Sequence, residues 1–129
     1  MSPVLLLAER EQHLEALARN LHAMPDLRVI ALPAWDRRKI AQPGFDLVVA
    51  CFGCEMAGRC IPELRELQPA AKLLALTPFS GMFSETDLVG LGADDVLRLP
   101  VTSGRLAVTI RNLLKTGALE RRLRESMIA

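Results

Sequence analysis

Asp46-Leu47-Val48-Val49-Ala50-Cys51 is the stretch that decides the fold of this chain. From Leu47 onward it is continuously apolar, without the alternation of a half-buried strand, and this is typical of a strand covered on both faces of a parallel sheet. The run ends at Cys51, and the loop Phe52-Gly53 follows directly. We expect a functional site near Cys51, because open α/β sheets bind ligands outside the carboxyl ends of their strands.

Other apolar runs and helix-like stretches alternate on either side of this strand. The remaining strand candidates are residues 4–8, 27–32, 72–77 and 96–99. The helix candidates are residues 11–24, 34–41, 59–67, 84–91 and 102–115. Five strands alternating with helices predict an α/β fold, a doubly wound five-stranded parallel sheet of order 2-1-3-4-5 with helices on both faces.

Composition predicts one folded domain and excludes several classes of protein. The chain has 129 residues, of which 50% are hydrophobic and 24% charged, so it is not a disordered chain. Its net charge of +1 gives no global attraction to nucleic acid or to membranes, and no apolar run is long enough to span a bilayer. Three cysteines do not make a disulfide framework. We therefore expect a cytoplasmic protein whose domain binds neither nucleic acid nor membrane.

Over residues 3–116 the chain resembles the response-regulator receiver domains (CheY-like domains) of two-component, phosphorelay signal transduction. The likeness rests on the turn Gly92-Ala93-Asp94-Asp95 before the last strand, on Pro100 after that strand, and on Thr77 at the end of the fourth. Receivers accept a phosphoryl group on an aspartate that ends the third strand, beside acids that hold Mg²⁺. The resemblance places Cys51 at that aspartate and Ala8-Glu9 at the pair of acids.

The resemblance also implies that this phosphorylation pocket is degenerate. Leu99 stands where receivers carry a lysine, Val96 stands at the switch aromatic, and Glu9 is the one remaining acid of the pocket. Mg²⁺ needs several oxygen ligands, which a thiol at Cys51 and a single carboxylate do not supply. Thr77 is then expected to act as a strand-end residue and not as a phosphate sensor. We expect a pseudo-receiver, a signalling and interaction domain that is no enzyme and has no cofactor and no metal.

Two alternatives remain open for the same residues. Cys51-Phe52-Gly53-Cys54 has the Cys-x-x-Cys spacing of redox pairs, so a thiol redox switch would use Cys51 and Cys54. A buried structural role is the competing interpretation, because cysteine is among the most often buried residue types. The other alternative is a phosphoreceiver with an atypical acceptor. Both histidines, His13 and His22, are expected on the surface without a catalytic partner.

The C-terminal residues carry an apolar stripe of their own. After Gly117 the sequence predicts a further helix, in which Leu119, Leu123 and Met127 recur at intervals of four residues among charged neighbours. A stripe this narrow does not fold alone, so the helix needs a partner surface.

We accordingly divide the chain into a receiver-like domain, residues 1–116, and residues 117–129, which are either a helical extension or a linker to an output domain regulating transcription. By the same resemblance we expect a homodimer through the fourth helix, fifth strand and fifth helix. The candidate residues of that dimer face are Leu88, Val89, Val96, Leu106 and Ile110.

Overall fold

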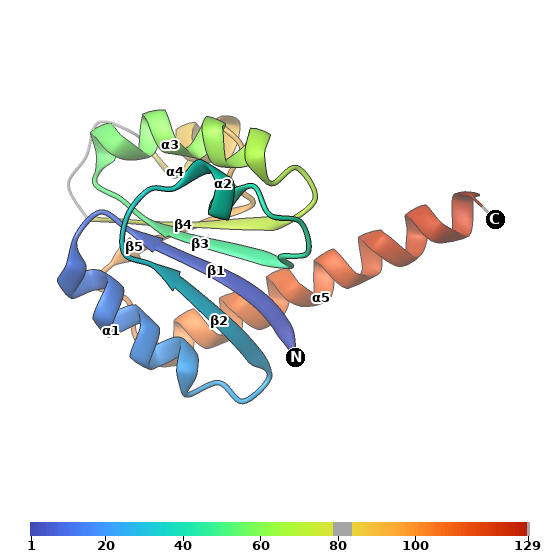
Figure 1. Cartoon of the computed structure of the whole chain (residues 1–129), viewed down its shortest axis with the longest axis horizontal. Coiled ribbons are helices and arrows are strands. Elements are labelled where there is room, and N and C mark those ends of the chain that lie inside the picture. Colours follow the sequence, from blue (N-terminus) through green and yellow to red (C-terminus); the bar gives the residue numbers. More distant parts are fainter. Residues whose placement is uncertain (79–83, 129) are drawn as a thin grey trace.

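Five parallel strands form a sheet in the order β2-β1-β3-β4-β5, which confirms the predicted α/β fold (Figure 1). The computed structural model describes residues 1–78 and 84–128. The strands are β1 (Ser2–Ala8), β2 (Leu27–Leu32), β3 (Leu47–Cys51), β4 (Lys72–Pro78) and β5 (Asp95–Leu99). The helices are α1 (Glu11–His22), α2 (Arg37–Ile40), α3 (Cys54–Leu67), α4 (Glu85–Gly90) and α5 (Ser103–Ile128).

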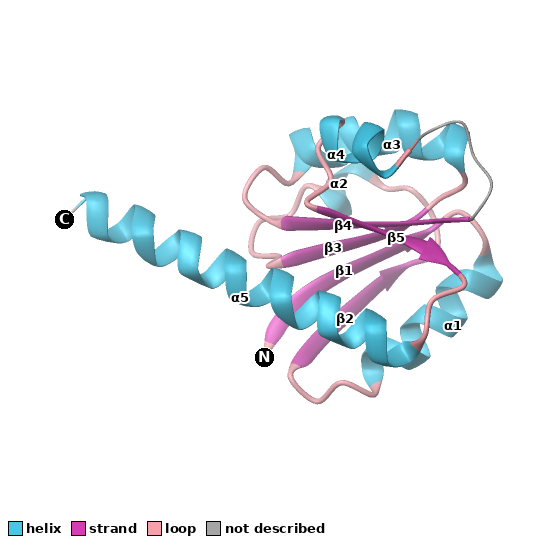
Figure 2. Cartoon of the chain, turned by 180° about the vertical axis from the view of Figure 1, so that it is seen from behind, coloured by secondary structure: helices cyan, strands magenta, loops and turns pink. Residues whose placement is uncertain are grey.

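The sheet lies between two layers of helices. Figures 1 and 2 show α2, α3 and α4 over one face and α1 and α5 over the other. Each layer buries its own apolar cluster against the sheet, and β3 contributes to both: Val48 and Ala50 belong to the first cluster, Val49 and Cys51 to the second. Every residue of β3 is buried, as its continuous apolar run predicts.

The turn before β5 is built by Asp94. Its carboxylate accepts from the backbone N–H of Leu73 at 2.8 Å and from Arg65 Nη2 at 2.7 Å. Arg65 also donates from Nη2 to the carbonyl of Gly92 at 2.9 Å. Gly92 adopts φ +128°, a left-handed conformation that L side chains rarely adopt. The turn therefore joins α3, β4 and β5 through one guanidinium and one carboxylate.

Two predicted helix boundaries are wrong by five residues or more. Helix α3 begins at Cys54 and not at residue 59, because the Gly53 carbonyl accepts from the N–H of Ala57 at 2.8 Å and closes an earlier first turn. Helix α5 is one continuous helix that runs through Gly117, so residues 102–115 and 118–129 are not separate helices. Its second half projects past the amino ends of the strands (Figures 1 and 2).

Gly117 has no steric reason to be glycine, which makes it a direct test of the continuous helix. A Cβ added there would lie 3.4 Å from Lys72 Cγ, an ordinary contact distance. Alanine forms helix better than glycine, so Gly117→Ala should raise the free energy of unfolding by about 1 kcal/mol in urea denaturation. As a control, Gly92→Ala should lower it by about 1 kcal/mol or more, because φ is positive there. A destabilised Gly117→Ala protein would contradict a helix that passes unbroken through this position.

Candidate functional site

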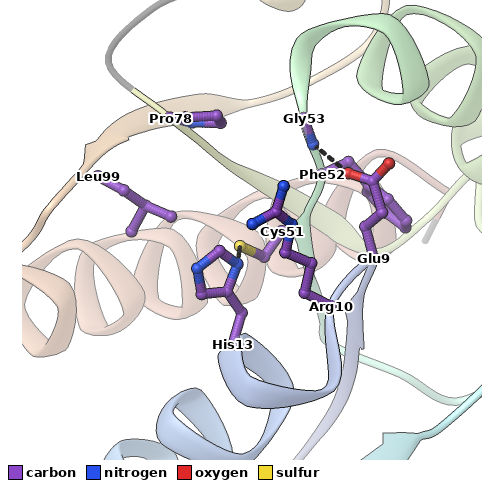
Figure 3. A pocket seen from close by; sticks show the side chains of 8 residues that line it. All are labelled: Glu9, Arg10, His13, Cys51, Phe52, Gly53, Pro78 and Leu99. Carbon is purple, nitrogen blue, oxygen red and sulfur yellow. Dashed lines mark hydrogen bonds between the residues drawn. The ribbon is translucent and has the colours of Figure 1, made fainter.

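A small pocket opens at the carboxyl ends of the strands, where the sequence predicted the site (Figure 3). Its volume is about 150 Å³. The loop after β1 and the first turn of α1 form one wall, the end of β3 forms the floor, and the ends of β4 and β5 close the other side. The lining residues are Glu9, Arg10, His13, Cys51, Phe52, Gly53, Pro78 and Leu99.

Glu9 is held against the backbone of the loop that follows β3. Its Oε2 accepts from the N–H of Gly53 at 2.8 Å, the dashed bond at the upper right of Figure 3. A Cβ on Gly53 would lie 3.0 Å from the same oxygen, so a side chain there would push the carboxylate back by a few tenths of an ångström. The backbone N–H of Glu9 also donates to the carbonyl of Cys51 at 2.9 Å. Side chain and backbone together fasten the β1–α1 loop to the end of β3.

Cys51 lies at the floor of the pocket with only 2% of its surface exposed. Its Sγ is 3.9 Å from Nδ1 of His13, the second dashed contact of Figure 3. Burial, reinforced by the negative charge of Glu9, raises the pKa of the Cys51 thiol to about 11. The thiolate is the reactive form of cysteine, so at neutral pH Cys51 behaves as a small apolar side chain and not as a nucleophile.

Of the predicted pocket residues, the structure brings Glu9, Cys51 and Leu99 together. Ala8 pairs with Cys51 in the register of β1 and β3 and packs against the same apolar cluster, but it is not among the lining residues of this pocket. Thr77 is fully buried next to Arg98, whose Nη1 donates to its Oγ1 at 3.3 Å. The Thr77 hydroxyl therefore has a structural partner, as expected for a strand-end residue.

One pocket residue, His13, was not predicted as a member of the site. It was expected on the surface without a partner, yet it is half-buried and faces Cys51 across the pocket (Figure 3). The available signal was position: the first turn of a helix that directly follows a strand lies over the carboxyl edge of the sheet. Its side chain points there only because α1 begins at Glu11, immediately after that edge.

The proposed redox pair is described only in part. The side chain of Cys54 lies outside the described residues, so its distance from Cys51 is not given by the structure. The third cysteine, Cys60, belongs to α3 and is buried in the apolar cluster between the helices and the sheet. Burial together with Glu63 and Glu9 raises the pKa of the Cys60 thiol, against the lowering effect of Arg59. The raised pKa values of Cys51 and Cys60 both disfavour a reactive thiolate.

Four of the five residues assigned to a dimer face are core residues, which corrects that assignment. The buried four are Leu88, Val96, Leu106 and Ile110. Leu88, Leu106 and Ile110 are buried because α4 and α5 turn their apolar sides toward the sheet, and periodicity does not distinguish that side from a second apolar face. Val96 lies in the sheet itself, in β5, and is covered by the first helix layer. Val89, with 49% of its surface exposed, is the one residue of the set that can contact a partner.

Among the side chains that the structure describes, a set that leaves out Cys54, no three His, Cys, Asp or Glu groups lie close enough together to hold a metal ion. Within residues 1–78 and 84–128, no helix combines the length and the apolar character needed to cross a membrane.

The raised pKa of Cys51 predicts a pH dependence of stability. The folded pKa of about 11 lies above the ordinary 9.0, so the contribution of the neutral thiol is complete below pH 9 and is lost as the pH rises through 11. The free energy of unfolding should fall by about 3 kcal/mol more across this range in the wild type than in Cys51→Ala, measured by urea denaturation. Equal slopes in the two proteins would contradict a thiol kept neutral by burial.

The sequence matches no protein-family model and no curated protein. Solved structures with this fold do exist. A response regulator receiver domain from Clostridium thermocellum matches with a TM-score of 0.76 and 18% identity, over 92% of this chain and 98% of that one. A protein from Burkholderia pseudomallei described as pilus assembly-related matches with a TM-score of 0.71 and 23% identity, over 89% and 90% of the two chains.

A third match is to part of a larger protein. NtrX from Brucella abortus matches with a TM-score of 0.80 and 16% identity, over 97% of this chain and 29% of NtrX. At these identities the likeness concerns the fold. The chain has the five-stranded α/β fold of CheY-like receiver domains, with its pocket at the carboxyl ends of the strands.

Proposed function

We propose that this chain is a receiver-like signalling domain that is not phosphorylated and that acts through contacts with other proteins. The observation that carries the proposal is the buried, neutral thiol of Cys51 at the end of β3. The resemblance to receivers assigns that position to the phosphoacceptor aspartate. A phosphoryl group transferred to an aspartate forms an acyl phosphate, which a thiol does not form.

The rest of the pocket supports the same proposal. Glu9 is the single carboxylate among the lining residues, and its Oε2 is already bound to the N–H of Gly53. Mg²⁺ favours octahedral sites made of oxygen ligands, whereas Cys51 and Leu99 offer sulfur and carbon. In the degenerate pocket Leu99 and Pro78 supply apolar surface instead, and this surface stabilises the fold without a counter-ion.

For the contact surface we propose the exposed part of the α4–β5–α5 side, used in a homodimer. Val89 on α4 and Val108 on α5 are about half exposed, and both belong to this side of the domain. The projecting half of α5 adds the exposed side chains of Leu119, Leu123 and Met127. These replace the buried leucines and isoleucine as the candidates for association.

The proposal also concerns the larger protein to which the domain belongs and the cellular compartment in which it acts. The match covers 29% of NtrX, so that protein carries further chain beside this fold. In this protein, an output domain that regulates transcription would follow α5. Proteins from two Burkholderia species with this fold are described as pilus assembly proteins, which favours a role inside a larger assembly. We place the domain in the cytoplasm, where its thiols stay reduced.

The proposal predicts that phosphoryl donors and their analogues do not act on the domain. Acetyl phosphate, or beryllofluoride with Mg²⁺, should leave the ¹H–¹⁵N NMR spectrum unchanged around Cys51, Thr77 and Val96, because neither acceptor nor metal ligands are present. A phosphorylatable receiver domain in the same buffer is the positive control. Shifts at these residues on adding beryllofluoride would contradict the proposal and favour an atypical acceptor.

The proposed homodimer predicts concentration-dependent association in analytical ultracentrifugation. Val89→Glu and Leu123→Glu should each weaken it, since a charge would be buried in an apolar contact. Val29→Ala, on the far edge strand β2, is the matched control and should leave association unchanged. A stable dimer buries at least about 1,000 Å², so a chain that stays monomeric at high micromolar concentration would point to a different partner protein.

A further inference from the structure

We propose that two ion pairs form a latch, which holds the projecting half of α5 against the amino edge of the sheet and thereby sets the direction of this helix. In one pair the helix supplies the anion, and in the other it supplies the cation. The projecting half comprises residues 117–128, and the two pairs join Lys72 with Glu120 and Asp46 with Arg121. What this direction means for signalling rests on the function proposed above. The latch itself is a property of the single chain.

The two pairs reach neighbouring strands from consecutive helix residues. Lys72 Nζ lies 2.9 Å from Oε1 and 2.8 Å from Oε2 of Glu120. Arg121 Nη1 lies 3.6 Å from Oδ1 of Asp46. Lys72 begins β4 and Asp46 directly precedes β3, and the Lys72 N–H donates to the Asp46 carbonyl at 3.0 Å. Both anchors therefore sit on the rigid central strands, at the edge of the sheet where α5 leaves it (Figure 2).

The order of the charges makes the latch selective for one rotation of the helix. At the edge of the sheet, Lys72 supplies a cation and Asp46 an anion. The helix faces them with the opposite charges, those of Glu120 and Arg121. Turning α5 by one residue in one direction would bring Arg121 toward Lys72, and turning it in the other direction would bring Glu120 toward Asp46. Each turn would lose both observed pairs and set like charges against each other at one anchor, so the electrostatics favour the observed rotation over both neighbours.

The latch connects to the turn that precedes β5. Lys72 Nζ also lies 3.8 Å from Oδ1 of Asp94, whose Oδ2 accepts from Arg65 at 2.7 Å. An ordered series of charges therefore runs from α3 through the α4–β5 turn to α5. A contact that moves Arg65 or Asp94 would alter the charge around Lys72. Its effect would then reach the projecting helix by a route that does not involve the Cys51 pocket.

Exposure and helix propensity make this latch releasable. The Lys72 side chain is 12% exposed, but Glu120 is 47% exposed and Arg121 42%, so salt screens both pairs. The latch lies next to Gly117, the weakest helix former between the packed and the projecting halves of α5. Release of the pairs would let the helix bend at this glycine.

The latch can be tested by residual dipolar couplings of the full chain, aligned in a stretched neutral gel at a concentration at which it is monomeric. In the wild type, the N–H couplings of residues 119–127 should fit the alignment of the sheet. Asp46→Lys and Arg121→Glu should each make the N–H couplings of residues 119–127 smaller, and the couplings of the other residues should stay the same. The double variant Asp46→Lys/Arg121→Glu restores opposite charges and should recover the wild-type couplings.

Two further variants separate the latch from general effects on the helix. Arg122→Glu makes the same change of charge one residue away, where no ion pair is formed with a described residue, and should leave the couplings unchanged. Gly117→Ala in the Arg121→Glu background should recover part of the loss, because alanine stiffens the bend point.

The inference is overturned if residues 119–127 of the wild type have small couplings, if Arg121→Glu leaves them unchanged, or if the double variant does not restore them. None of these measurements involves a phosphoryl donor or a dimer. A phosphorylatable or strictly monomeric protein would refute the proposed function while leaving the couplings as described, so the two failures are distinguishable.

Discussion

The burial of β3 between two apolar layers is the constraint on which the rest of the structure depends. A strand with no exposed residue must lie inside the sheet, because it needs a neighbour on each side and helices over both faces. It also decides the chemistry at its end. Cys51 lies where the strand emerges from the core, so the thiol remains in an apolar environment and stays protonated.

The two ends of this sheet have different characters. At the carboxyl end, Glu9 bonds to the Gly53 backbone and the remaining pocket walls are largely apolar. At the amino end, Lys72 and Asp46 anchor the long helix through ion pairs. The charges that a phosphorelay pocket would concentrate at one end are thus sparse there, and the ordered charges of this chain lie at the other end, beside the part of the molecule that projects.

Burial also changes which residues are available for contacts. Residues such as Leu88 and Leu106 are spaced as an exposed apolar face would be, but they supply the packing that holds α4 and α5 on the sheet. Only apolar side chains beyond that requirement, Val89 and Leu123 among them, remain exposed. In this fold, the apolar side chains available for an interaction surface are those that the core does not bury.

The sequence by itself determined the fold class, the strand order and the end of the sheet that carries the pocket, because apolar periodicity and the turn at Gly92 are local signals that survive without tertiary contacts. It did not determine that α5 continues through Gly117, that His13 faces Cys51, or which leucines are buried. Those were decided by tertiary structure, because each depends on a partner distant in the chain: Lys72 for the helix, the end of β3 for the histidine, and the sheet for the leucines.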